Sequence, residues 1–253
     1  MRSLRIIPRL DVKGDRLVKG VHLEGIRPIG KPEDFARAYY EQGADELLYM
    51  DVVASLYGRN SMLDIVERTA RDVFVPITVG GGIRSLDDIR AALRAGADKV
   101  AINTWAVQHP DFINEAAQTF GSSTIVVSIE SKRRGAAWEV YTDSGRERTG
   151  RDAVGWAREA AARGAGELLV TSIDRDGTQR GYDVGLISAI APLVNVPVVA
   201  CGGAGSAVHV AEVVQRGKAD AVCVGAALHY GKATIEGLKG DLMAKGLKCR
   251  RAA

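Results

Sequence analysis

The stretch Arg5-Ile6-Ile7-Pro8-Arg9-Leu10-Asp11-Val12-Lys13, near the start of the chain, decides the fold. Its apolar run has the composition of a short buried strand, and the run ends in a carboxylate followed by a lysine. The same arrangement returns half a chain later in Ile125-Val126-Val127-Ser128-Ile129-Glu130-Ser131-Lys132, where Glu130 takes the place of Asp11. The repeat predicts two matching strand ends, each carrying one carboxylate.

Runs of this kind alternate with segments of helical period along the whole chain. Pro32 suits the first turn of a helix, and Ser85 with Asp88 has the spacing of a capping box. Strands are expected at 5–11, 46–51, 75–79, 99–102, 123–129, 166–171, 197–201 and 221–224. This alternation predicts an α/β fold, with residues 1–253 forming a single (β/α)8 TIM barrel. A doubly wound open sheet is the alternative. Such a fold is expected to carry a dinucleotide-binding fingerprint after its first strand, and residues 13–16 do not have that sequence.

The chain also repeats itself at the half. Residues 44–48 match 165–169, and residues 75–82 match 196–203. The repeat predicts two half-barrels, about 1–120 and 121–253, with the first strand opposite the fifth. Asp11 and Glu130 would then stand on opposite sides of one barrel mouth.

Composition excludes several classes of function. A hydrophobic content of 46% and a net charge of +3 are those of an ordinary globular protein, not of a nucleic-acid binder. There is no signal-peptide pattern and no apolar run long enough to span a membrane. Cys201 and Cys223 lie in apolar runs and are expected to be reduced core thiols of a cytoplasmic protein. The histidines lack ligand spacing, so neither a metal nor a cofactor is expected.

Two glycine pairs, one in each half, follow a strand and precede a helix. Backbone N–H groups of such glycines can approach an anion closely, and (β/α)8 barrels commonly hold phosphate at this end. The strand after each pair ends in further mouth residues. The phosphate-binding candidates are Gly81, Gly82, Asn103, Thr104, Gly202, Gly203, Val224 and Gly225. Two equivalent sites favour a small substrate with a phosphate at each end, although tight turns alone would also explain the glycines.

These residues carry a resemblance that covers roughly residues 4–247. The most specific stretches are 78–83, 96–104, 171–178 and 202–205. In them the chain resembles the cyclase subunit of imidazole glycerol phosphate synthase, the HisF type of the histidine-biosynthesis barrels. The resemblance implies a lyase that uses ammonia to cleave and cyclise phosphoribulosyl-formimino-aminoimidazole carboxamide ribotide, which carries two phosphates.

The resemblance also implies a partner and residue roles. A glutaminase would dock at the N-terminal barrel face, and its ammonia would cross the barrel to the mouth. Asp11 matches one of two acid/base carboxylates, Lys19 matches a substrate-binding lysine, and Ser144 and Asp176 match other mouth positions. Asp176 is equally well explained as an anchor of its own turn. An ammonia gate is implied at Arg5, Glu46, Lys99 and Glu167, for which the alternative is a salt-bridged plug.

Three departures from the family are visible. Glu130 replaces the second catalytic aspartate, Arg9 replaces a cysteine, and the loop 21–30 differs from the usual one. They keep open a second reading, an ammonia-channelling paralogue that helps to amidinate a surface-polysaccharide sugar. A phosphosugar isomerase of the sister barrel type needs no ammonia gate and fits less well. An arginine beside Asp11 would hold that carboxylate ionised, which predicts slow turnover of the formimino ribotide by the unmodified chain.

Overall fold

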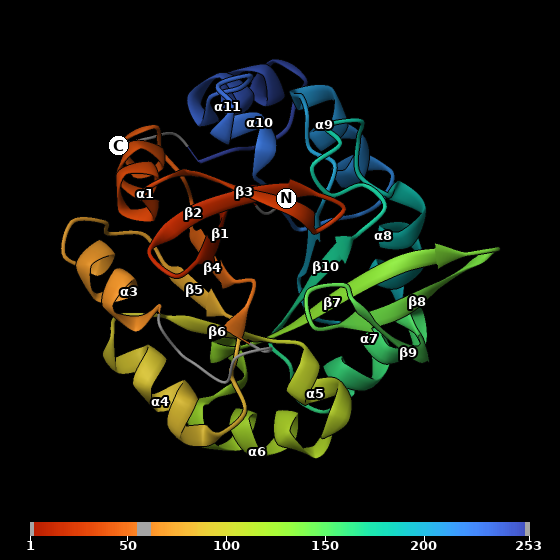
Figure 1. Ribbon diagram of the computed structural model, residues 1–253. Helices are drawn as coiled ribbons and strands as arrows, with labels where there is room; N and C mark the ends of the chain where they lie inside the picture. Colours follow the sequence, from red (N-terminus) through yellow and green to blue (C-terminus); the bar gives the residue numbers. More distant parts are fainter. Residues whose placement is uncertain (1–2, 55–61, 251–253) are drawn as a thin grey trace.

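The computed structural model describes residues 3–54 and 62–250, and its strands close into a parallel barrel (Figure 1). β1 pairs with both β4 and β12, and β7 pairs with both β6 and β10. This order places β1 opposite β7, so the predicted (β/α)8 barrel is confirmed. The barrel strands are β1 (Arg5–Lys13), β4 (Leu47–Asp51), β5 (Ile77–Gly80), β6 (Lys99–Ile102), β7 (Ile125–Arg134), β10 (Glu167–Ser172), β11 (Val198–Cys201) and β12 (Ala221–Val224).

Helices surround the barrel (Figure 1). The predicted capping box is present at the start of α4, where Ser85 and Asp88 exchange hydrogen bonds. Two short helices that the sequence did not predict, α5 and α10, begin at the mouth directly after β6 and β12. None of the described helices is long and apolar enough to cross a bilayer. The helices are α1 (Pro32–Glu41), α3 (Leu63–Ala70), α4 (Leu86–Arg94), α5 (Thr104–Gln108), α6 (Asp111–Phe120), α7 (Ala153–Ala162), α8 (Val184–Ile190), α9 (Ala207–Gln215), α10 (Ala226–His229) and α11 (Ile235–Ala244), with 3-10 turns at Ser122–Thr124 and Ala191–Leu193.

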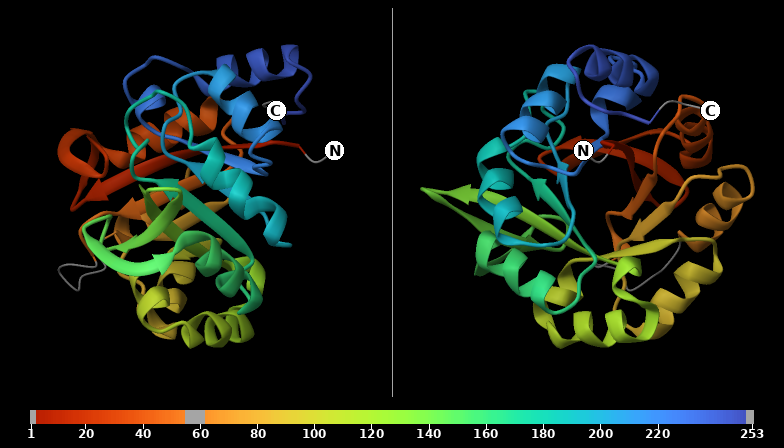
Figure 2. Two further views of the ribbon diagram at one scale, coloured as in Figure 1. Left: turned by 90° about the vertical axis from the view of Figure 1, so that its right-hand side faces the viewer. Right: turned by 180° about the vertical axis from the view of Figure 1, so that it is seen from behind.

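Two antiparallel extensions of the barrel strands were not predicted either. β2 (Arg16–Val21) and β3 (Glu24–Gly30) continue from β1, while β8 (Ala137–Thr142) and β9 (Glu147–Asp152) continue from β7. The β2–β3 hairpin lies at the end of the barrel opposite the start of β1 (Figure 2, left). β3 has no buried residue, and its sequence lacks the apolar alternation that would have indicated a strand.

The two larger apolar cores of the described residues lie between the barrel and the helices and inside the barrel, and a third, small cluster joins Leu23, Tyr141 and Ile173. β1 separates them by alternation, because Ile6 and Leu10 pack in the outer core while Ile7 packs in the inner one. The charged residues Arg5, Arg9 and Asp11 share the inward phase of Ile7. One strand therefore carries charges from one end of the barrel interior to the other.

Candidate active site

Four buried charges gather at the mouth, where β1 and β2 meet the loop after β10. Nε of Arg9 donates to Oδ1 of Asp11 at 2.7 Å, and Nζ of Lys19 donates to Oδ2 of Asp11 at 3.0 Å. Lys19 also donates to both carboxylate oxygens of Asp176, at 3.1 and 3.0 Å. All four side chains are almost fully buried. The cluster joins three of the expected site residues with Arg9, and its formal charges cancel.

This pairing fixes the protonation of Asp11. Burial by itself would raise the pKa of Asp11, but the ion pairs with Arg9 and Lys19 outweigh it and hold the pKa well below its usual range. The same pairing raises the pKa of Lys19, against the effect of burial. The expectation that Arg9 keeps Asp11 ionised is therefore confirmed. Asp11 is an anion throughout the physiological range and cannot donate a proton.

Glu130 is the second carboxylate of the mouth and titrates very differently. Oε2 of Glu130 accepts a hydrogen bond from Nδ2 of Asn103 at 3.2 Å, and Glu130 lines a cavity of about 350 Å³. Burial raises the pKa of Glu130 to about 7, with Arg9 opposing the rise and Asp11 adding to it. Protonated Glu130 is thus available as an acid near neutral pH.

The large cavity brings together the phosphate candidates of the first half. Its walls include Gly81, Gly82, Asn103, Thr104 and Ser144. A Cβ on Gly81 would lie 2.3 Å from the carbonyl oxygen of Asp51, so this close turn needs a glycine. Oγ of Ser144 donates to the carbonyl oxygen of Val52 at 3.0 Å, which holds the hydroxyl at the cavity wall.

The candidates of the second half lie around a smaller cavity on the other side of the mouth. Gly202, Gly203 and Gly225 line it, together with Lys19 and Asp176. A Cβ on Gly203 would lie 2.1 Å from the carbonyl oxygen of Gly181. The side chain of Val224 instead packs in the outer core and lines neither cavity. Any part that Val224 plays in phosphate binding would have to come from its backbone.

Crystals grown in phosphate or sulfate should test both glycine sites. We expect one anion near Gly82 and Asn103 and a second near Gly203 and Gly225, because backbone N–H groups at glycine turns can approach an anion closely. The measurement is the electron density at the mouth. Anions found only on other surfaces would contradict the assignment of two phosphate sites.

A ring of alternating charges lies at the opposite end of the barrel. Arg5 bonds Glu46 and Glu167 at 2.6 and 2.5 Å, and Lys99 bonds the same two glutamates at 2.9 and 3.0 Å. All four residues predicted for the gate thus meet in one ring. The two glutamates raise the pKa of Arg5 even though its burial opposes the rise. Each of the four charged side chains of the ring has an oppositely charged partner within it.

Several contacts of Arg9 were not foreseen from the sequence. Nη1 of Arg9 lies 3.3 Å from Oγ1 of Thr171 and 3.4 Å from Sγ of Cys201. The Arg9 carbonyl oxygen lies 2.9 Å from Nε2 of His229, a ring whose burial lowers its pKa to about 4. Cys201 and Cys223 are free, buried thiols. No signal in the sequence pairs residues so far apart in the chain.

Comparison with known proteins gives consistent matches. The family model described as "Histidine biosynthesis protein" matches residues 5–234. A protein of Legionella pneumophila is 57% identical over 206 residues, covering 81% of this chain and 97% of the relative. Relatives from Myxococcus xanthus (50% identical, 99% of both chains) and Synechocystis (51%, 98% of this chain and 97% of the relative) match almost end to end. All three relatives are named imidazole glycerol phosphate synthase subunit HisF. This chain belongs to the histidine biosynthesis protein family.

Proposed function

We propose that this chain is the cyclase subunit of a two-subunit imidazole glycerol phosphate synthase, a lyase of histidine biosynthesis. It takes ammonia and phosphoribulosyl-formimino-aminoimidazole carboxamide ribotide to imidazole glycerol phosphate and aminoimidazole carboxamide ribotide. The observation that carries the proposal is the pair Asp11 and Glu130, whose pKa values are pushed apart by their surroundings. We place the enzyme in the cytoplasm, and no cofactor is required by this chemistry.

The two carboxylates divide the work. Asp11 remains an anion and stabilises positive charge on the attacking nitrogen, while Glu130, with its pKa of about 7, donates the proton. Asn103 orients Glu130 through its 3.2 Å hydrogen bond. Lys19 and the two glycine sites hold the phosphates. The slow turnover expected from the sequence assumed that Asp11 must donate a proton, and an acid at Glu130 removes that reason.

Ammonia comes from a glutaminase subunit that binds the N-terminal barrel face. The support is the ring of Arg5, Glu46, Lys99 and Glu167, which lies at the end of the barrel interior away from the mouth. Its acids and bases are paired in the described state, so opening the ring requires new partners for these charges. A docked subunit supplies them at the moment when ammonia is released.

Replacing Lys99 by alanine should uncouple the two subunits. Because Lys99 bonds both Glu46 and Glu167, its loss leaves those acids held by Arg5 alone and opens the ring. Glutamine hydrolysis should continue while product per glutamine falls several-fold, and turnover with ammonium chloride should be kept. The ratio of glutamate to imidazole glycerol phosphate measures this. Arg68→Ala, which removes a surface ion pair with Glu33 instead, is the control. If Lys99→Ala has the same ratio of glutamate to imidazole glycerol phosphate as the wild type, the ring has only a structural role.

The buried Arg9 is the observation that favours the second candidate, a subunit that channels ammonia for amidination of a sugar. The comparisons favour the cyclase. Turnover of the formimino ribotide by the purified subunit with ammonium chloride tests the choice, and we expect ammonia-dependent product. A folded protein that binds phosphate but forms no product would refute the cyclase function.

A further inference from the structure

We infer that Cys201 and Cys223 form a redox-active thiol pair, in which a small hydroperoxide oxidises Cys201 and Cys223 then closes a disulfide with it. The inference does not depend on the proposed function. Both cysteines are free and buried in the reduced chain. Disulfides of cytoplasmic proteins are usually transient and catalytic or redox-sensing, and a bond between these two residues would be of that kind.

The strand register places the two cysteines side by side. Ala200 of β11 pairs with Val222 of the parallel strand β12. The next residue on each strand is a cysteine, which puts Cys201 beside Cys223. Both side chains belong to the apolar core inside the barrel, so they point to the same face of the sheet. Adjacent strands lie about 4.8 Å apart, and a disulfide needs Cα atoms about 4.4–6.8 Å apart, so the bond requires no large backbone movement.

Arg9 and Cys223 prepare Cys201 for oxidation. Nη1 of Arg9 lies 3.4 Å from Sγ of Cys201. A hydrogen bond from Cys223, together with the charge of Arg9, lowers the pKa of Cys201 to about 6, although burial opposes the shift. The same hydrogen bond and burial raise the pKa of Cys223 well above its usual range, so Cys223 keeps its proton. Because the thiolate is the reactive form of cysteine, Cys201 is the nucleophile and Cys223 is the second thiol.

The size of the adjoining space selects the oxidant. Both cysteines line the small cavity at the mouth that Gly202 and Gly203 also line, and its volume is about 20 Å³. Such a cavity holds about one molecule of the size of water, and hydrogen peroxide is only slightly larger. A bulky oxidant such as glutathione disulfide does not fit there. The pair is therefore suited to a small hydroperoxide.

One molecule of hydrogen peroxide balances the two steps. The thiolate of Cys201 attacks one peroxide oxygen, the O–O bond breaks, and the departing hydroxide takes up a proton and leaves as water. Cys201 is then a sulfenic acid. The sulfur of Cys223 attacks the sulfur of Cys201, the S–O bond breaks, and the second hydroxide leaves as water with the proton of Cys223. Two electrons thus pass from the sulfur atoms to the peroxide.

Treatment of the folded full-length chain with hydrogen peroxide near pH 7 tests the pair, with peptide mass spectrometry as the measurement. We expect a disulfide between Cys201 and Cys223 and recovery of both thiols with dithiothreitol. Cys249→Ser, which changes the third free cysteine, is the matched control and should form the same disulfide at the same rate. Thiols at Cys201 and Cys223 that stay reduced, or a disulfide that involves Cys249, would overturn the inference.

Single substitutions separate the roles of the two thiols and of Arg9. Cys223→Ser should stop at a sulfenic acid on Cys201, which dimedone traps. Cys201→Ser should leave Cys223 unoxidised, and oxidation of Cys223 at the wild-type rate would overturn the choice of nucleophile. Arg9→Met should slow the reaction about tenfold, because a thiol of ordinary pKa is only about a few per cent ionised at pH 7. A wild-type rate in Arg9→Met would overturn the part given to Arg9.

Discussion

Replacing Asp11 by asparagine is expected to lower ammonia-dependent turnover about 10²- to 10³-fold, the usual effect of removing one group that stabilises developing charge. The side chain keeps its shape but loses the negative charge that faces the attacking nitrogen. Turnover of the formimino ribotide at saturating ammonia measures the effect. Phosphate affinity should change little, since the glycine turns remain. Wild-type turnover in this variant would remove Asp11 from the mechanism.

The same substitution also has a cost in stability that needs its own control. Asp11 forms ion pairs with Arg9 and Lys19. Removing one partner of a buried ion pair lowers the free energy of unfolding by about 3–5 kcal/mol. Asp45→Asn is matched to it, because Asp45 is equally buried and pairs with buried Lys239 at 2.8 Å away from the mouth. Both variants should lose thermal stability, but only Asp11→Asn should lose turnover per folded molecule.

Replacing Glu130 by glutamine should lower turnover to a similar extent, about 10²- to 10⁴-fold, because an amide cannot donate the proton. Wild-type turnover should itself fall as pH rises above about 7, where Glu130 loses its proton. The measurement holds the concentration of ammonia constant, so that the falling limb reports the enzyme and not the substrate. If turnover by Glu130→Gln still falls as the pH rises above about 7, the proton donor is a group other than Glu130.

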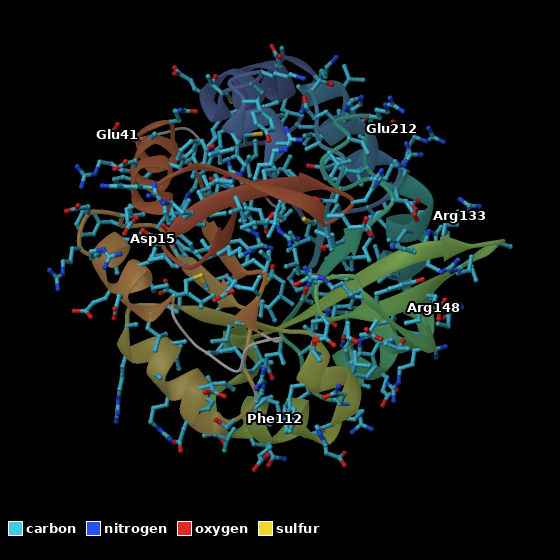
Figure 3. All side chains as sticks on the ribbon, in the orientation of Figure 1. Asp15, Glu41, Phe112, Arg133, Arg148 and Glu212 are labelled. Atoms are coloured by element: carbon cyan, nitrogen blue, oxygen red, sulfur yellow. The ribbon has the colours of Figure 1, made fainter. Side chains whose placement is uncertain are left out.

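Shortening the side chain tests whether the mouth is built for a glutamate. Glu130→Asp withdraws the carboxylate by about 1 Å and weakens its contact with Asn103, and a shift of that size costs up to about 10²-fold. Glu139→Gln is the control and should leave turnover unchanged, because Glu139 lies on β8 and bonds Arg148 of β9. Arg148 lies on the side of the molecule away from α1, together with Arg133 (Figure 3). Faster turnover by Glu130→Asp would show that the mouth still suits the shorter acid.

The barrel was predictable because its strands follow one simple rule. Each is a short apolar run, and the half-chain repeat fixes which strands lie opposite each other. The hairpin β2–β3 was not predictable, since β3 has no buried residue and its order comes from pairing with β2. The short helix α5 was missed for a related reason: five residues are too few to show a helical period.

Site residues were predictable only where the residue type and its place at a strand end or a turn indicate a function without knowledge of its neighbours in space. Asp11 and Glu130 end strands, and the glycines mark close turns, so all could be named in advance. The partners of Arg9 could not be named, because Thr171 and Cys201 are brought to it by closure of the barrel. The opposite protonation of Asp11 and Glu130 likewise depends on burial and neighbours, which only three-dimensional packing supplies.

The long strand β7 has a mechanical consequence. Glu130 pairs with Thr171 of the barrel on one side and with Tyr141 of the projecting hairpin on the other. Glu130 thus lies at the point where the barrel part of β7 continues into the hairpin that β7 forms with β8 and β9. A force that tilts this hairpin acts on the backbone of Glu130 itself, so a contact made on the outside of the molecule can shift this carboxyl group.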